Sequence, residues 1–326
     1  NYSDFGSLVT GKLALRYQPQ SRVVLRAAAS NGFRAPGLSQ VHFSKIVTNV
    51  IAGVPEQVGV FPVDNPASKL LGAKPLKEET SINLSAGIAV TPMPPLTFTL
   101  DYFNIKINDR ILLGATFDDA ATLGILAGAG YTGIGGVQYF TNGLDTRTQG
   151  VDFVADYRVS VPADQTLTFS LAANYTKNEI THVDPLPDVL VQAGSTEPGI
   201  LDVVTKVAIE KERPDWRGML TGTYSKSRLH ALARLSYYGK FSSAQPGYCD
   251  TCEEPYGAKT LVDAELGYKY GPVDLSIGGR NLFSTYPDHP KQDFNNNFGT
   301  FPYAAASPFG YNGRYIYTRA SVAMPN

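Results

Sequence analysis

The stretch from Thr166 to Tyr175, T-L-T-F-S-L-A-A-N-Y, shows the pattern that decides the fold of this chain. Leu167, Phe169 and Leu171 alternate with small or polar residues, and a period of two places the two sets on opposite faces of a β-strand. The run is about ten residues long, which is the length that a strand needs to cross a bilayer obliquely. A half-buried strand of a water-soluble protein could show the same alternation, so this stretch alone leaves the fold open.

The alternation recurs along the chain and predicts about eleven strands, at residues 8–17, 22–30, 81–90, 96–107, 151–159, 166–175, 219–224, 229–238, 261–270, 273–280 and 314–324. Their connections alternate strictly between a tight turn and a long loop. Outer-membrane barrels have short turns on the periplasmic side and long loops outside, whereas a soluble sandwich has no reason to keep its short turns at one end. We therefore predict an all-β fold, an antiparallel transmembrane β-barrel.

The order of turns and loops also predicts an orientation. The long loops at 31–77, 111–145, 181–213, 242–258 and 281–312 are expected outside the cell. The tight turns at 18–21, 91–95, 160–164, 225–227 and 270–272 are expected in the periplasm.

Three segments depart from the regular pattern. The fourth predicted strand changes phase between Tyr102 and Phe103, which indicates either a β-bulge or the point where the strand leaves the lipid. The stretch at 120–129 could form a short helix inside an otherwise irregular loop. We interpret V-Q-Y-F within 131–145 as an upward extension of the fifth strand.

The composition fits a barrel and excludes other classes. No apolar run approaches the length of a transmembrane helix, and the mean hydropathy of −0.13 is that of a soluble protein. A barrel shares this profile because only every second residue faces lipid. The aromatic residues are mostly tyrosine and phenylalanine, as expected where rings lie at a membrane–water boundary. The net charge of −1 gives no argument for a nucleic-acid partner.

Charged residues of both signs lie on the predicted inward faces of the strands, where a wet lumen tolerates them and lipid does not. The alternative is that several of them lie above the membrane on extended strand ends. They are Arg26, Asp101, Asp152, Asp156, Arg234, Asp263, Glu265, Asp274 and Arg280.

Several motifs occur in an order that resembles the C-terminal half of the barrel of TonB-dependent outer-membrane receptors. N-G-F-R-A-P at 31–36 follows a strand and precedes a long loop, and L-K-E-E-T-S at 76–81 leads to D-Y-F-N-I-K-I-N-D-R-I at 101–111. T-N-G-L-D-T-R-T-Q-G-V-D at 141–152 and G-R-N-L-F at 279–283 complete the set. No single motif is decisive, and the specificity comes from their order across nearly the whole chain.

The resemblance implies that residues 1–326 are one barrel unit, about half of a barrel of roughly 22 strands whose lumen is plugged. An odd number of strands cannot close an antiparallel barrel with both ends at the periplasmic rim. Neither a plug nor a TonB box is recognisable in this sequence, and Met324 takes the place of the family's usual terminal aromatic residue.

The same resemblance implies a non-enzymatic receptor of the bacterial outer membrane that takes up a scarce nutrient, such as a siderophore or a sugar. The expected partners are outer-membrane lipid and lipopolysaccharide, a small-molecule ligand, and the TonB complex, reached through an N-terminal part. The alternatives are a secreted soluble β-protein that binds carbohydrate, and a barrel enzyme.

Few residues suggest further chemistry. Cys249 and Cys252 have C-x-x-C spacing, but the chain has no second cysteine pair and only four histidines, so a zinc site lacks ligands. In an exposed loop of an oxidising compartment they are expected to form a disulfide. No catalytic motif such as G-x-S-x-G or H-E-x-x-H occurs. An inward His230 could be imagined as a catalytic base, but an isolated inward histidine is more often structural. We expect no catalytic residue, metal or cofactor.

The last long loop interleaves aromatic rings with amides, which suits stacking on a sugar, an aromatic compound or a siderophore. An aromatic girdle combined with self-packing of the loop is the alternative. Arg34 and Arg280, at strand ends, are expected to be scaffold charges. The predicted ligand-binding residues are Tyr286, Phe294, Asn296, Phe298, Phe301 and Tyr303.

Overall fold

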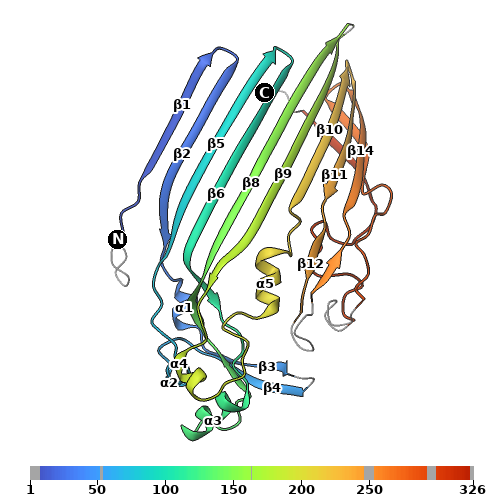
Figure 1. Cartoon of the computed structure of the whole chain (residues 1–326). Coiled ribbons are helices and arrows are strands. Elements are labelled where there is room, and N and C mark those ends of the chain that lie inside the picture. Colours follow the sequence, from blue (N-terminus) through green and yellow to red (C-terminus); the bar gives the residue numbers. More distant parts are fainter. Residues whose placement is uncertain (1–7, 52–53, 163, 246–252, 292–298, 324–326) are drawn as a thin grey trace.

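A single antiparallel sheet of eleven strands forms the body of the protein, in the order β1-β2-β5-β6-β8-β9-β10-β11-β14-β15-β16 (Figure 1). The computed structural model describes residues 8–51, 54–162, 164–245, 253–291 and 299–323. Each of the eleven predicted strands corresponds to one strand of this sheet, and the predicted fold class is confirmed. The strands are β1 (Lys12–Gln20), β2 (Val23–Arg34), β5 (Glu79–Met93), β6 (Leu96–Leu113), β8 (Phe140–Val161), β9 (Gln165–Val183), β10 (Trp216–Lys226), β11 (Leu229–Tyr238), β14 (Lys259–Tyr270), β15 (Val273–Arg280) and β16 (Tyr315–Val322).

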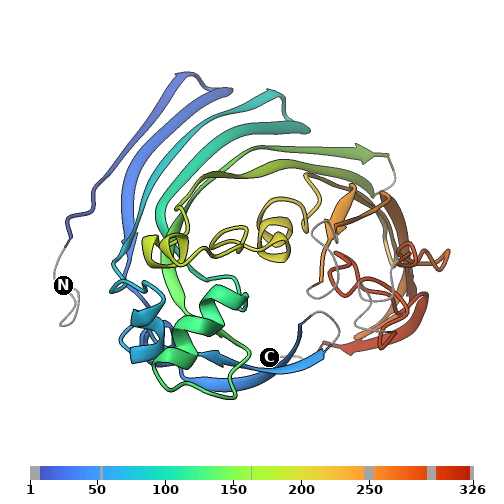
Figure 2. The same cartoon turned by 60° about the horizontal axis from the view of Figure 1, so that its bottom comes forward.

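The sheet curves into a wall that encloses part of its own connections (Figure 2). All tight turns lie at one end of the wall, and the long connections gather at the other end (Figure 1). Two of these turns place Asp164 and Ser227 at positive φ, the backbone conformation typical of tight hairpins. In the described residues the sheet is open, with β1 and β16 as its edges. This is the arrangement expected of part of a larger barrel.

The long connections contain short elements of their own. They are α1 (Leu38–His42), β3 (Lys45–Ile51), β4 (Val54–Val60), α2 (Pro66–Leu70), α3 (Ala120–Gly128), β7 (Gly136–Gln138), α4 (Asp188–Gln192), α5 (Val203–Glu210), β12 (Phe241–Ser243) and β13 (Glu254–Tyr256). The predicted helix at 120–129 is confirmed as α3. No helix among the described residues is long and apolar enough to cross a membrane.

Two predictions about the long loops were wrong. The irregular segment predicted at 31–77 contains two helices and two strands, each too short to show a clear period and each formed through packing on its neighbours. Residues 136–138 do not extend the fifth predicted strand, because β7 pairs with β4 in a separate three-stranded sheet. The extension begins only at Phe140, the first residue of β8.

Three of the long connections build a common hydrophobic core, and we call the assembly of α2, α3, α4 and the β3–β4–β7 sheet the cap. Side chains from the β2–β5, β6–β8 and β9–β10 connections pack together in this core. Its buried members are Phe61, Ala67, Leu71, Phe117, Leu126, Val137, Tyr139, Leu190 and Ile200. The cap therefore holds together by burial of apolar side chains, as a water-soluble domain does.

The register of the strands places all nine predicted inward charges on one face of the wall. Helix α5 packs against the same face, where Glu210 accepts a hydrogen bond from the backbone N–H of Ile180 at 2.9 Å. Figure 2 shows α5 on the concave side of the wall. These charges therefore face the lumen, as predicted.

The opposite face of the wall is apolar and bordered by two rows of aromatic rings. Toward the turns the rings belong to Tyr17, Tyr157, Phe169, Tyr224, Tyr268 and Tyr270. Toward the cap they belong to Tyr102, Tyr175, Trp216 and Tyr237. The step from Trp216 to Tyr224 covers about 26 Å of strand at about 3.3 Å per residue. With the usual tilt of barrel strands, this gives about 20 Å of depth, close to the apolar band of an outer-membrane barrel.

The phase change in the fourth predicted strand marks the edge of this apolar band. The pairing of β5 with β6 runs without a shift from Val90–Phe98 to Thr80–Asn108, so no β-bulge lies between Tyr102 and Phe103. Beyond Tyr102 the outward side chains of β6 become polar, with Asn104 and Lys106 in the outward phase. The pairing excludes the bulge, and these polar side chains support the alternative in which the strand leaves the lipid here.

Candidate functional site

Ion pairs on the lumen face connect strands that are not neighbours. Arg26 on β2 donates from Nε to Oδ1 of Asp101 on β6 at 2.7 Å, although β5 lies between them. Strands flanking a third one are about 9.6 Å apart, and the two side chains meet above Gly87 of β5. A Cβ atom at Gly87 would lie 1.8 Å from Oδ1 of Asp101. Glycine is therefore required at this position for the ion pair to form.

The same arrangement occurs twice more on the lumen face. Tyr317 on β16 donates to Glu265 on β14 at 2.7 Å, above Gly278 of β15. The ring of His230 on β11 lies above Gly267 of β14, and its Nε2 is 3.5 Å from Oδ1 of Asp274 on β15. These contacts hold the His230 side chain against the sheet, which supports the structural role expected for it.

Arg34 also holds the wall together. Its Nε donates to Glu79 at 2.9 Å, and the buried Glu79 carboxylate accepts a second hydrogen bond from the N–H of Ile111 at 2.7 Å. This arrangement supports the scaffold role expected for Arg34. The corresponding role of Arg280 stays a prediction.

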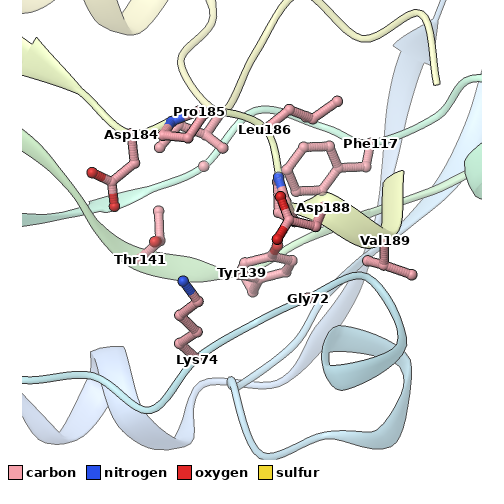
Figure 3. A pocket seen from close by; sticks show the side chains of 13 residues that line it. Gly72, Lys74, Phe117, Tyr139, Thr141, Asp184, Pro185, Leu186, Asp188 and Val189 are labelled. Atoms are coloured by element: carbon pink, nitrogen blue, oxygen red, sulfur yellow. The ribbon is translucent and has the colours of Figure 1, made fainter. Parts of the chain in front are cut away.

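A cavity of about 290 Å³ opens between the cap and the end of the wall (Figure 3). Phe117, Tyr139 and Ile200 form an apolar floor, and the Tyr139 hydroxyl donates to the backbone oxygen of Leu71 at 3.0 Å. Burial raises the pKa of Tyr139, so this ring stays neutral.

The rim of the cavity is polar. Lys74 and Thr141 face Asp184 on one side, and Asp188 lies across from them at the start of α4 (Figure 3). An apolar floor with a few polar groups around it is the usual composition of a small-molecule site. The cavity can take a small ligand with an apolar or aromatic body and polar substituents.

Beside the cavity, a group of carboxylates ties two connections of the cap together. Glu197 accepts from the backbone N–H groups of Asp118 and Asp119 at 2.8 and 3.0 Å. Asp119 in turn accepts from the Ser195 hydroxyl at 2.7 Å and from the N–H of Thr122 at 2.8 Å, which caps α3. These contacts hold the β9–β10 connection against the N-terminal end of α3.

The two aspartates of this group differ in acidity. Burial raises the pKa of Asp118 to about 6, helped by the negative charges of Glu197 and Asp119. Burial acts in the same direction on Asp119, but the hydrogen bonds from Thr122 and Ser195 outweigh it and lower the pKa of that carboxyl. Asp118 is therefore a group of the cap that titrates near neutral pH.

The last long loop brings three of the six predicted ligand residues together. The rings of Tyr286 and Tyr303 stack with centroids 5.5 Å apart, and His289 stacks on Tyr303 at 4.6 Å. Phe301 reaches the cluster through Tyr311, with centroids 6.3 Å apart. Part of this aromatic surface is used within the loop, while Tyr286 stays 40% exposed. The ligand role of these residues stays a prediction.

The other predicted site residues lie outside the described part of the chain. These are Phe294, Asn296, Phe298, Cys249 and Cys252. Within the described ranges, no group of three or more His, Cys, Asp or Glu side chains is placed to hold a metal ion.

Sequence reasoning missed the cavity. Its rim residues Lys74 and Asp184 come from two different connections, and Thr141 comes from the start of β8. Thr141 is the first residue of the motif at 141–152, but nothing in that motif indicates a cavity. His289 was missed because a single histidine among aromatic residues has no distinctive spacing. Only the folded cap shows these groups together.

A model of the family described as TonB dependent receptor-like, beta-barrel matches residues 1–282. The chain belongs to this family. TonB-dependent receptor barrels reside in the bacterial outer membrane, which is therefore the location of this chain. The family and its solved relatives are receptors and transporters, in agreement with the expectation that the protein is not an enzyme.

Solved structures of this kind share the fold at low sequence identity. The siderophore receptor PirA from Acinetobacter baumannii is 14% identical with a TM-score of 0.61, covering 98% of this chain and 41% of its own. A mutant of the ferric enterobactin receptor PfeA from Pseudomonas aeruginosa is 19% identical with a TM-score of 0.63, covering 96% and 40%. The copper transporter OprC is 14% identical with a TM-score of 0.55, covering 95% and 39%.

This TonB-dependent receptor barrel thus spans about two fifths of the length of these solved receptors. Among curated protein sequences, none matches the chain significantly. At these low sequence identities, the similarity to the solved structures shows a shared fold and nothing more.

Proposed function

We propose that the full-length protein takes up a scarce small-molecule nutrient across the outer membrane, with energy supplied through TonB. The observation that carries the proposal is the position of the cavity and the aromatic cluster, both in the long connections at one end of a wall with a charged lumen face. Family membership and the solved relatives, which are named as siderophore receptors and a copper transporter, support uptake as the activity.

The ligand that these groups fit has a flat or aromatic body and polar substituents. Tyr286, Phe301 and Tyr303 offer stacking surfaces, and Phe294, Asn296 and Phe298 stay candidates from the same loop. A ferric siderophore meets this description. The cavity beside Lys74 and Asp184 would take a substituent of such a ligand.

An uptake experiment tests the function. Cells that carry or lack the full-length receptor are given labelled ferric siderophores, copper and oligosaccharides, with and without an uncoupler of the proton gradient. We expect faster uptake of one compound in receptor-carrying cells, abolished by the uncoupler. Equal uptake of every compound by both strains would contradict the proposal.

Two substitutions locate the ligand on the receptor. Tyr303→Ala removes the central ring of the aromatic cluster. Stacking between aromatic rings contributes about 1 kcal/mol, so we expect several-fold weaker binding of the ligand. Phe283→Ala removes an exposed ring outside the cluster and serves as the matched control. Equal losses in the two variants would argue against a ligand at Tyr303.

The long connections should lie outside the cell and the tight turns in the periplasm. The proposed contacts with outer-membrane lipid and lipopolysaccharide, and with TonB through a part of the full-length protein outside this chain, depend on that orientation. Single cysteines at Ser195 and Pro162, in the full-length receptor with Cys249 and Cys252 replaced by serine, can be labelled in intact cells. Reagent that reaches Pro162 but not Ser195 would overturn the orientation.

Cys249 and Cys252 are proposed to form a disulfide in one of the external loops. Removing both cysteines should leave barrel insertion unchanged. Two free thiols titrated on oxidised, folded protein would contradict the pairing.

A further inference from the structure

The outward face of the wall carries a group of charged residues just beyond the row of aromatic rings toward the cap. Lys106 on β6 lies directly opposite Arg147 on β8, and Arg147 lies directly opposite Glu179 on β9. Lys106 follows the outward Tyr102 by four residues, and the pairing of β6 with β8 runs without a shift from Tyr102 to Ile107. Residues directly opposite each other share one face of a sheet. The register therefore turns all three charges away from the lumen.

A third cation, Lys177, lies on β9 two residues beyond Tyr175 and in the same outward phase. It forms an ion pair with Glu179, and the charge of Asp215 also attracts it. Carboxylates of the protein therefore balance the charge of Lys177. The surplus positive charge of the group lies at the other two cations.

Those two cations repel each other across the strands. Within the described ranges, neither Lys106 nor Arg147 has a carboxylate at ion-pair distance, although Glu179 attracts Arg147 from farther away. The Asn104 amide, oriented so that its oxygen accepts, takes hydrogen bonds from Nε and Nη2 of Arg147 at 2.9 and 2.6 Å. Like charges directly opposite each other destabilise a sheet, so an anion bound between Lys106 and Arg147 would stabilise this part of the wall.

The aromatic row sets the height of these cations in the membrane, because tyrosine and tryptophan rings lie at the boundary between hydrocarbon and headgroups. Four residues from Tyr102 to Lys106 cover about 13 Å of strand at about 3.3 Å per residue, which the usual tilt of barrel strands reduces to about 10 Å of height. The two residues from Tyr175 to Lys177 give about half of that height. The polar zone of a phospholipid leaflet is only about 5–7 Å deep, so the group fits a thicker headgroup.

Apolar side chains border the cations on the neighbouring strand. Ile82 of β5 lies opposite Lys106, and Leu84 lies opposite Asn104, both in the outward phase. Their side chains are 51% and 49% exposed. The cations therefore lie next to a surface that acyl chains can cover.

We propose that Lys106, Arg147 and Lys177 bind the phosphates of lipid A, the acylated and phosphorylated disaccharide of lipopolysaccharide, in the outer leaflet. Guanidinium and ammonium groups donate charge-assisted hydrogen bonds to phosphate oxygens. A phosphate between Lys106 and Arg147 removes their repulsion, and the acyl chains lie along Ile82 and Leu84. The sugar rings supply the height that a phospholipid headgroup lacks. The inference deepens the lipopolysaccharide contact proposed above and rests on the orientation proposed with it.

Native mass spectrometry of the full-length receptor tests the proposal. Delipidated protein in a neutral detergent is titrated with lipid A that carries two phosphates, with the same lipid after removal of both phosphates, and with phosphatidylglycerol. We expect the phosphorylated lipid A to bind at least about tenfold tighter than either of the other two lipids. This comparison needs no substitution, so it decides the matter even if a variant does not fold. Binding to the purified receptor depends on neither uptake nor orientation, which the uptake experiment and the cysteine labelling report separately.

Two double variants locate the lipid on the wall. Lys106→Gln with Arg147→Gln removes the two cations that lack a carboxylate partner, and should weaken the binding of phosphorylated lipid A at least about tenfold. The matched control, Arg158→Gln with Arg217→Gln, removes two exposed cations from the lumen face and should change the affinity less than about twofold. Equal losses in the two variants, equal binding of lipid A with and without its phosphates, or equally tight binding of phosphatidylglycerol would overturn the proposal.

Discussion

The wall and the cap are stabilised in different surroundings. In the wall, outward side chains such as Leu100 and Ile277 are 44% and 56% exposed because lipid is their partner. In the cap, Phe117 and Leu126 are buried almost completely by other side chains. The wall holds its shape through backbone ladders and lumen-face contacts, whereas the cap relies on a core of its own. The two regions should therefore respond to mutation independently.

The largest expected effect is on the cap. The Phe117 side chain is only 1% exposed, so Phe117→Ala leaves a void in the core of the cap. Such truncations lower the free energy of unfolding by about 3–5 kcal/mol. Hydrogen exchange should show faster exchange in α2, α3 and α4, while the wall keeps its protection and its resistance to SDS without heating. Loss of the wall together with the cap would show that the two regions are not independent.

The next effect tests the lipid-facing side of the wall. Leu220→Arg places a charge on the outward face of β10, at an expected cost of about 2–4 kcal/mol near mid-depth. Thr223→Arg, on the lumen face of the same strand, is the control and should cost much less. Unfolding in lipid vesicles measures both, and equal costs would show that the two faces are wrongly assigned.

A pH-dependent effect should be confined to the cap. The native cap keeps a proton on Asp118 up to pH about 6, whereas an unfolded chain releases it near pH 4. Cap stability should therefore fall as the pH rises from 4 to 6, and stay low above that range. The shift corresponds to about 3 kcal/mol, which screening at this partly exposed carboxyl reduces to about 1–2 kcal/mol.

Asp118→Asn should remove this loss and stabilise the cap at pH 7. Asp64→Asn, at an exposed aspartate of the β2–β5 connection of the cap, is the control and should leave the pH profile unchanged. Hydrogen exchange of α3 at pH 4 to 7, corrected for intrinsic exchange rates, gives the measurement. If the stability of the cap falls with pH as steeply in Asp118→Asn as in the wild type, the Asp118 carboxyl is not the cause of the pH dependence.

The smallest effect concerns the lumen face. Gly87→Ala should displace Asp101 and break its pair with Arg26, at a cost of about 1 kcal/mol for a partly exposed pair. If Gly87→Ala lowers the stability only by breaking this ion pair, adding it to Asp101→Ala should not lower the free energy of unfolding further. Urea unfolding of the four proteins of this cycle tests the coupling, and fully additive losses would contradict it.

The wall could be predicted from the sequence because a period of two is visible in every strand, as in Thr166–Tyr175. Even the phase change at Tyr102 was readable, though only the register chose between a bulge and an exit from the lipid. Apart from α3, the cap could not be predicted, because elements such as α2 and β7 are five and three residues long. Their stability comes from partners far away in the chain.

The candidate site shows the same division. The aromatic residues of the last loop were found because they are close in sequence, and Tyr286, Phe301 and Tyr303 do come together. Lys74 and Asp184 of the cavity rim are separated by more than a hundred residues. No local pattern connects them, so their proximity appears only once the three connections have folded on one another.

The pairs that reach over Gly87 and Gly278 have a mechanical consequence. A load applied to β2 is passed to β6 through Arg26 and Asp101, in parallel with the backbone ladder of the strand between them. Neighbouring strands are thus tied in groups of three, and the wall resists shear better than a ladder alone would. Pulled from one end by force spectroscopy, β2, β5 and β6 should detach in one step, and Gly87→Ala should let β2 detach separately.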